Sequence, residues 1–296
     1  MRYWMLAAVI GLGASTVLAE NEFVESKVTI RVVDQSGTPV TNALVSANSY
    51  SHPRSVDGVT DTNGVFEYSD RIGGGLSCFV KKDGYYETGG EIWGGPKQWN
   101  DHPRSPFTVV LKKIVNPSPL IFRQVVAHPP RLGEPIAFDL AAGDWVAPDG
   151  KGRMPDIWFK SVKRMTSRSD FDFTVTVTFS NEMDGIQEFK ALDSRSVYLA
   201  SDLMPPQEAP LNGYTNRLIA FVQMHPKTVP AESWTENRNY IYRIRARKNE
   251  KGELVEANVG WLRGDIRVGP TLDKNGVIMF NYYYNPDPKS RSLESK

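Results

Sequence analysis

Apolar and polar residues alternate along much of this 296-residue chain. A period of two residues is typical of β-strands that bury one face. The clearest run is residues 171–179, where Phe and Val alternate with Asp and Thr. Shorter alternating or apolar runs predict further strands at 28–33, 43–47, 65–68, 76–82, 107–113, 240–262 (a hairpin) and 277–284. No stretch has a convincing helical period over three turns, so we predict an all-β protein.

Breaks in this pattern predict two units. Residues 26–114 contain five or more short strands separated by turns, as in a β-sandwich. Residues 137–285 form a second β-rich unit, expected to be a β-sandwich or jelly-roll-like domain, in which a turn at 184–185 would pair 171–179 with 186–192. Residues 115–136 hold five prolines and several apolar residues, and predict an extended segment packed between the units. Residues 286–296 are a polar tail, expected to fray.

The hairpin over 240–262 has a predicted inner and outer face. On the first strand, one face is expected to carry Tyr240, Tyr242, Ile244 and Ala246. On the returning strand, the matching face is expected to carry Val255, Ala257, Val259 and Trp261. The residues between them would form a basic outer stripe: Arg243, Arg245, Arg247 and Lys248. Glu253 and Glu256 on the returning strand are expected to neutralise this stripe.

Three motifs in residues 26–114 carry a family resemblance. They are Val-x-Asp34-x-x-Gly37-x-Pro39-Val40-x-x-Ala43-x-Val45, then Thr60-Asp61-x-x-Gly64-x-Phe66, then Lys82-Asp-Gly84-Tyr85. Together they resemble the transthyretin-like, carboxypeptidase regulatory-like domain family. The resemblance implies a seven-stranded sandwich that accompanies peptidases, surface proteins and receptors and has no catalytic residues of its own. The segment between Tyr86 and Phe107 is predicted to be a long loop, which departs from the typical pattern.

The N-terminus predicts export. Arg2, an apolar run from Met5 to Leu12 and small residues up to Ala19 predict a signal peptide over residues 1–19, with cleavage after Ala19. No later apolar segment approaches spanning length, so we expect no integral membrane segment after cleavage. The destination would be periplasmic, cell-surface or secreted. Cys78, the single cysteine, lies between Leu76 and Val80 and is expected to be a buried thiol.

Charge and motifs exclude several chemistries. The chain holds 35 Lys and Arg residues against 34 Asp and Glu residues, which does not favour a nucleic-acid partner. All four histidines precede proline and lack the spacing of a zinc site, so solvated loop histidines are expected. Asp57 to Gly64 fits a turn better than a calcium loop. No nucleophile elbow and no phosphate-binding glycine loop occurs. We therefore expect no metal and no cofactor.

Aromatic residues in a glycine-rich segment remain as a candidate site. Glycine cannot bury rings locally, so these rings either pack on the other unit or present a surface for sugar rings or peptide side chains. The candidate ligand-binding residues are Tyr85, Tyr86, Trp93, Gln98, Trp99, Asn100 and Asp101. In the alternative interpretation, Trp93 and Trp99 fill the seam between the units.

These features predict a non-catalytic exported binding protein, for a glycan or another envelope protein. One alternative is an extracytoplasmic hydrolase with a carboxylate site in the second unit, for instance around Asp139, Asp144, Asp149 and Asp156. That alternative requires these acids to share one pocket. The other alternative is a structural envelope component.

Overall fold

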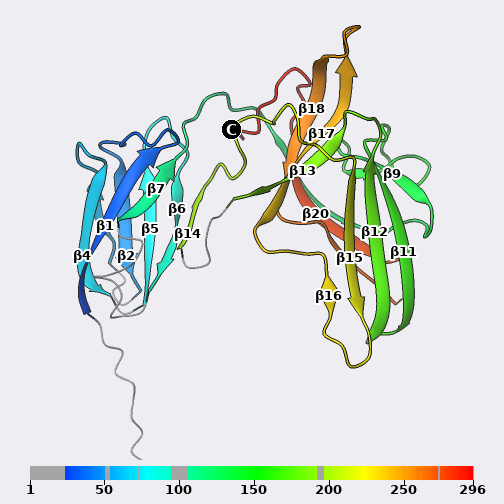
Figure 1. Cartoon of the computed structure of the whole chain (residues 1–296), viewed down its shortest axis with the longest axis horizontal. Helices are drawn as coiled ribbons and strands as arrows, with labels where there is room; N and C mark the ends of the chain where they lie inside the picture. The colour runs from blue at the N-terminus through cyan, green and yellow to red at the C-terminus, as the bar shows by residue number, and fades with distance from the viewer. Residues whose placement is uncertain are drawn as a thin grey trace, which may run out of the picture.

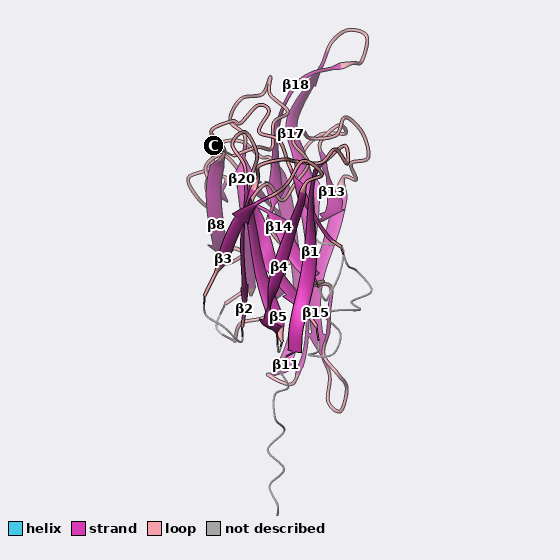
Figure 2. Cartoon of the chain, turned by 90° about the vertical axis from the view of Figure 1, so that its left-hand side faces the viewer, coloured by secondary structure: helices cyan, strands magenta, loops and turns pink. Residues whose placement is uncertain are grey.

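The structure, a computed structural model, describes residues 24–50, 54–72, 74–94, 106–191, 197–272 and 274–295. In these ranges the chain is all-β, as predicted, and strands alternate with loops (Figure 2). No apolar helix of membrane-spanning length occurs among these residues. The predicted signal peptide lies outside them.

The first unit is a sandwich of a three-stranded sheet, ordered β4-β1-β7, and a five-stranded sheet, ordered β14-β6-β5-β2-β3 (Figure 1). Its strands are β1 (Val24–Asp34), β2 (Leu44–Ser49), β3 (Val56–Val59), β4 (Val65–Ile72), β5 (Gly75–Lys81), β6 (Thr88–Trp93), β7 (Phe107–Leu111) and β14 (Val197–Ser201). Alternate residues of both sheets meet in one core, including Ile30, Tyr68 and Leu76. Cys78 lies in this core, and burial raises the pKa of its thiol to about 12, so it is a structural thiol.

The fifth strand of this sheet comes from the second half of the sequence. β14 pairs antiparallel with β6, and Asp202 N donates a hydrogen bond to Glu87 O beyond the end of the pair. The first unit is therefore not the continuous stretch 26–114. The segment between Tyr86 and Phe107 was also expected to be a loop, whereas its first part forms β6.

The second unit packs a six-stranded sheet, ordered β10-β9-β11-β12-β15-β16, against a sheet ordered β13-β17-β18-β20-β19, with β8 paired to β20. Its strands are β8 (Ile121–Ala127), β9 (Pro135–Asp139), β10 (Asp144–Trp145), β11 (Ile157–Ser167), β12 (Asp170–Phe179), β13 (Gly185–Lys190), β15 (Arg217–Met224), β16 (Ala231–Glu232), β17 (Arg238–Lys248), β18 (Leu254–Leu262), β19 (Arg267–Gly269) and β20 (Val277–Tyr284). The core lies between these sheets and contains Phe138, Phe173, Tyr242 and Tyr282.

The predicted hairpin between 171–179 and 186–192 is wrong. β12 pairs with β11 and β15, whereas β13 crosses to the opposite sheet and pairs with β17. The residues between the strands explain this change of sheet. Asp184 is 3% exposed, and its carboxylate accepts hydrogen bonds from the backbone N–H groups of Arg245 and Ala246, which fixes the turn against β17.

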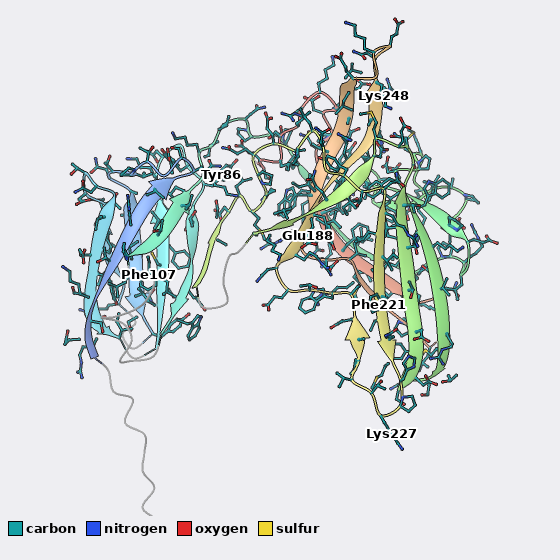
Figure 3. The ribbon with its side chains drawn as sticks, viewed as in Figure 1. Tyr86, Phe107, Glu188, Phe221, Lys227 and Lys248 are labelled. Carbon is teal, nitrogen blue, oxygen red and sulfur yellow. The ribbon has the colours of Figure 1, made fainter. Side chains whose placement is uncertain are left out.

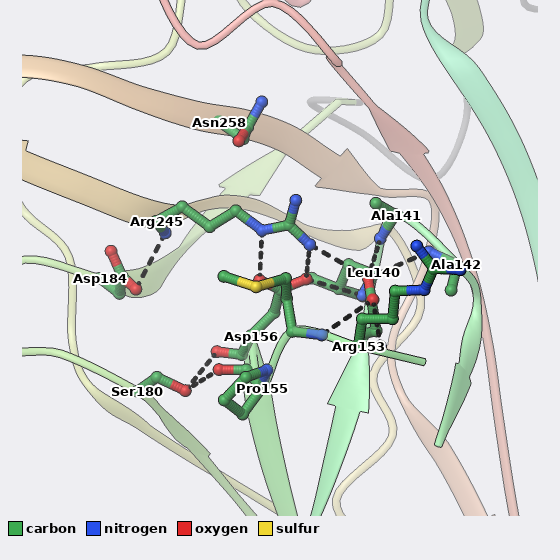
Figure 4. Close-up of polar contacts among 12 residues, drawn as sticks. Leu140, Ala141, Ala142, Arg153, Pro155, Asp156, Ser180, Asp184, Arg245 and Asn258 are labelled. Carbon is green, nitrogen blue, oxygen red and sulfur yellow. Dashed lines mark hydrogen bonds and ion pairs between the residues drawn. The ribbon is translucent and has the colours of Figure 1, made fainter. Parts of the chain in front are cut away.

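The β17–β18 hairpin exists, but its predicted faces are partly wrong. Trp261 is opposite Ile241, and Val259 is opposite Arg243, so these residues lie on the side away from the main core. A bulge follows Ile244, and Arg245 has a φ of 55°. The predicted basic stripe is therefore not a solvated outer face. Arg243 is 6% exposed beneath Met183 and Leu211, and Arg245, in the bulge, points to the buried carboxylate of Asp156 (Figure 4). Only Arg247 forms the expected cross-strand ion pair, with Glu256 at 2.9 Å.

The segment after β20 is not frayed. Asn285, Ser292, Leu293 and Glu294 are all at most 1% exposed. The polar residues can be buried because they are hydrogen-bonded: Ser118 N donates to Glu294 O, and Asn285 Nδ2 donates to Ser292 O. This segment covers the outer side of β17 and β18, where Leu293 packs with Trp261.

The same segment joins the two units. The Glu294 carboxylate accepts hydrogen bonds from the Tyr86 hydroxyl at 3.0 Å and from the backbone N–H groups of Val115 and Asn116 at 3.0 and 3.2 Å. Figure 3 shows Tyr86 at this junction. Nearby, Lys112 Nζ donates to the carbonyls of three successive residues, Leu203, Met204 and Pro205. The junction is thus built from satisfied hydrogen bonds.

The proline-rich segment belongs partly to the second unit. Residues 121–127 form β8, an outer strand beside β20. Val125 is buried, but Ile121, Phe122 and Val126 are 39%, 52% and 64% exposed. This part of the predicted connecting segment therefore packs on the second unit and leaves three apolar residues exposed.

Candidate functional site

The carboxylates proposed for a hydrolase site fall into two groups. Asp139 and Asp156 converge on one guanidinium: Arg245 lies 3.0 Å from Asp139 Oδ1 and 2.7 Å from Asp156 Oδ1 (Figure 4). The two acidic residues are 4% and 2% exposed. Asp184 lies on the other side of Arg245 and accepts its backbone N–H.

Backbone donors occupy the remaining lone pairs of this cluster. Asp139 accepts hydrogen bonds from four N–H groups, those of Ala141, Ala142, Arg153 and Met154. Asp156 also accepts one from the N–H of Leu140 at 2.8 Å. These carboxylates accept hydrogen bonds on both oxygens, and through them they connect the adjacent loops to β17. This geometry is that of a structural ion network.

The pKa values follow from these contacts. Burial pushes the pKa of Asp139 upward, but its backbone hydrogen bonds and Arg245 outweigh burial and hold it below the ordinary value. Burial raises the pKa of Asp156 despite Arg245. Burial also raises the pKa of Asp184 to about 6.

The other two acids of the predicted group have partners of their own, although Asp144 is the cross-strand neighbour of Asp139. Asp144 accepts hydrogen bonds from Trp145 N and Lys151 N within its own turn. Asp149 pairs with Arg131 at 2.6 Å. The four carboxylates are therefore engaged in separate contacts, and they do not form the convergent group that was given as an example for the hydrolase alternative.

Other candidate chemistry is likewise structural where it is described. Asp61 Oδ1 accepts hydrogen bonds from Asn63 N and Val65 N, so this sequence forms the expected turn. His128 and His225 are not simply solvated. His128 Nδ1 lies 2.7 Å from Gly276 O, and the His225 ring lies 3.2 Å from Asp170 and from Asp172. In the part of the chain that the structure describes, no group of three or more His, Cys, Asp or Glu residues could hold a metal ion.

The predicted aromatic residues do not form one cluster. Gln98, Trp99, Asn100 and Asp101 lie outside the described residues. Tyr86 lies in the junction, bonded to Glu294. Tyr85 precedes β6, and Lys113 Nζ lies 6.0 Å from the centroid of its ring. Trp93 lies at the other end of β6. Trp93 is 44% exposed and contacts Tyr50 of its own unit, with ring centroids 5.2 Å apart, so it does not fill the seam.

Trp93 belongs to a surface that we call the aromatic face, the outer side of β2, β5 and β6. Cross-strand register arranges this face in four rows of three residues. The first row is Tyr50, Gly75 and Trp93. The second row is Asn48, Ser77 and Glu91, and the third is Ser46, Phe79 and Gly89. The fourth row is Leu44, Lys81 and Glu87. Tyr50, Phe79 and Leu44 are 48%, 45% and 48% exposed. The polar second row therefore separates two ring-bearing rows, and the fourth row combines an exposed apolar side chain with two charged ones.

Two glycines let the rings lie on the sheet. A Cβ atom on Gly75 would lie 2.2 Å from the Tyr50 ring, and one on Gly89 would lie 2.1 Å from the Phe79 ring. The absence of a side chain at each position therefore seats a neighbouring ring against the backbone. Tyr50, Phe79, Asn48, Ser77 and Glu91 were not among the predicted site residues. The glycines at 75 and 89 are their sequence signal, but only the register shows which ring each glycine receives.

Polar groups connect the rings of the first row. Trp93 Nε1 donates a hydrogen bond to Glu91 Oε2 at 3.1 Å. Hydrogen bonding to the same carboxylate, more than burial, raises the pKa of the Tyr50 hydroxyl. Within the described part of the chain, the half-buried Asn48 amide has no hydrogen-bond partner, so it is open to a ligand.

A hollow of about 450 Å³ lies at the far end of the aromatic face. Its lining includes Leu44, Lys81 and Glu87 of the fourth row, together with Tyr85. Tyr85 is thus the predicted site residue that the structure places on the same surface as Trp93, at its opposite end.

No family model matches the chain, and no curated protein sequence is similar to it. The candidate function therefore depends on the aromatic face alone.

Proposed function

We propose that the protein is a non-catalytic exported binding protein that holds a glycan on the aromatic face. The observation that carries the proposal is the pair of half-exposed rings, Tyr50 and Trp93, whose centroids are 5.2 Å apart, with Trp93 Nε1 hydrogen-bonded to the Glu91 carboxylate. Exposed apolar patches mark binding sites on soluble proteins. An indole and a phenol beside hydrogen-bonding groups suit the apolar face and the hydroxyl edge of a sugar ring.

The alternation of rows favours a glycan over a protein partner. The centre of a protein interface is a continuous apolar area with few charged residues. On the aromatic face, the row of Asn48, Ser77 and Glu91 separates Trp93 from Phe79. A polyhydroxylated ligand can hydrogen-bond to such a row, whereas an apolar protein surface would leave it without partners.

The opposite face of the same unit supports this assignment by contrast. The outer side of the β4-β1-β7 sheet carries mostly polar residues and no exposed ring among the described residues, and two of its ion pairs are Lys27 with Glu67 at 3.3 Å and Arg71 with Glu25 at 4.0 Å. The resemblance to an accessory sandwich family and the predicted signal peptide agree with a non-catalytic role outside the cytoplasm.

Glycan binding is tested by screening the purified mature protein on a glycan array, followed by titration calorimetry with the best ligand. Trp93→Ala is expected to lower the affinity at least tenfold, because it removes a ring that contacts the ligand. Phe122→Ala is the matched control, because Phe122 is an aromatic residue of the second unit that is 52% exposed. Absence of binding to every glycan, with capture of a single envelope protein instead, would contradict the proposal.

Export is tested separately. Expression in a bacterium with a secretory pathway should yield an extracytoplasmic protein beginning at Glu20, as measured by mass spectrometry. Uncleaved protein in the cytosol would contradict the assignment.

A further inference from the structure

The aromatic face is an elongated surface along β5, which we call the track, and it is longer than a site for one sugar ring. Its four rows run from Gly75 to Lys81, which at about 3.3 Å per residue is about 20 Å. The two ring positions, Trp93 with Tyr50 and Phe79, are four residues of β5 apart, or about 13 Å. A single sugar ring cannot contact both positions.

The polar row between the rings is suited to the same ligand. Asn48 has an amide without a partner in the described chain, and Ser77 and Glu91 lie beside it across β5 and β6. A sugar chain that stacks on Trp93 and on Phe79 must pass over this row, where its hydroxyl groups can donate to Glu91 and pair with the Asn48 amide.

The hollow at Tyr85 extends the track and indicates the charge of the ligand. Its two lysines are already engaged: Lys81 pairs with Glu87 at 2.9 Å, and Lys82 Nζ donates to Asn42 O at 3.2 Å. Asp83 also lines the hollow. Balanced charges provide no cationic site for an acidic sugar, and Glu91 in the second row would repel one.

We infer that the ligand is a linear, uncharged oligosaccharide or polysaccharide lying along β5. One sugar stacks on Trp93 and Tyr50, a later sugar stacks on Phe79, and the chain continues into the hollow beside Tyr85. This inference rests on the proposed function and adds three predictions to it: the ligand is unbranched over this length, it is uncharged, and it occupies at least two ring positions.

The test is a length series. Titration calorimetry is performed on the full mature protein with cello-, xylo-, manno-, laminari- and malto-oligosaccharides of two to six sugars. At least one series should gain about tenfold or more in affinity between the shortest and the longest member, because the longer chains reach Phe79. Binding to the shortest member should require Trp93.

Two variants of the second ring position make the test specific. Phe79→Ala should abolish the gain with length while leaving the affinity for the shortest member unchanged. Gly89→Ala should do the same with the ring retained, because its Cβ atom would displace Phe79. Phe122→Ala should leave the whole series unchanged, and circular dichroism checks that each variant is folded.

The outcomes separate this inference from the proposed function. Affinity independent of length, or array binding confined to acidic or branched glycans, would overturn the inference while leaving a glycan-binding protein. Absence of binding to all glycans would overturn both.

Discussion

In the second unit, the outer side of β17, β18 and β20 carries Trp261 and Tyr283, stacked with ring centroids 4.4 Å apart. In the first unit, the aromatic face carries Tyr50 and Trp93, with ring centroids 5.2 Å apart. Trp261 is 4% exposed and Trp93 is 44% exposed. The difference arises because residues around Ala209 and Leu293 cover Trp261, whereas the aromatic face has no such cover among the described residues.

This contrast shows that the protein can bury an aromatic sheet face by laying irregular segments over it. The cover is anchored by polar residues: Arg243 stacks over Tyr214 at 4.4 Å and donates hydrogen bonds to the carbonyls of Met183 and Leu211. The rings of the aromatic face, which no described residue covers in this way, agree with the proposal that a ligand covers them.

The largest effect is expected for Trp261→Ala. Removing a buried indole costs about 3–5 kcal/mol of unfolding free energy, measured by chemical denaturation. Trp261→Phe is the control: it keeps most of the ring and removes an indole N–H that has no hydrogen-bond partner, so its cost should be much smaller. Equal costs for Trp261→Ala and Trp93→Ala would abolish the distinction between the two faces.

Local alternation predicted the strands well. The prediction at 171–179 became β12, and the one at 277–284 matches β20. Tyr283 faces away from Tyr282 and Tyr284, as a two-residue period requires. Burial of one face produces this signal within a few residues, so it can be read without knowing the partner strand.

Pairing could not be predicted in the same way. β14 joins the first unit although β13, just before it, lies in the second, and nothing in the alternation of residues 185–201 distinguishes the two destinations. The burial of Glu294 depends on donors about 180 residues earlier in the chain. The aromatic face likewise depends on which ring meets Gly75 and Gly89, which is a property of register.

The second prediction concerns the cover. Glu294→Gln replaces a carboxylate that accepts three hydrogen bonds with an amide that has one acceptor oxygen, and should cost about 2 kcal/mol. Proteolysis should then cleave residues 286–295 faster. Glu208→Gln is the control, because Glu208 is in an exposed pair with Arg291, which contributes about 0–1 kcal/mol. Unchanged stability in Glu294→Gln would mean that the junction does not hold the cover.

The third prediction concerns how stability depends on pH through two buried acids, Asp184 in the second unit and Asp34 in the first. In the folded protein the pKa of Asp184 is about 6, above its ordinary 3.8. The folded state therefore binds this proton more tightly, and the associated stability is present at low pH and lost as pH rises through 6. Between pH 5 and pH 7.5 the second unit should lose about 1 kcal/mol, measured by denaturation at each pH.

Two variants identify the group responsible. Asp184→Asn should remove most of this dependence on pH. Asp34→Asn in the first unit should not, because hydrogen bonding to Ser36 lowers the pKa of Asp34 to about 2, outside this range. An unchanged slope in Asp184→Asn would show that another group titrates.

The smallest effect on stability is expected at the aromatic face itself. Trp93→Ala should change the free energy of unfolding by less than about 1 kcal/mol, because the ring lies at the surface and contacts only the exposed side of its sheet. Phe122→Ala, which removes an equally exposed ring beside Tyr283, should cost a similar amount. A loss above about 2 kcal/mol for Trp93→Ala would mean that this ring protects the backbone at Gly75, and the aromatic face would then be a structural cap. A small loss together with lost glycan binding would assign the ring to the ligand.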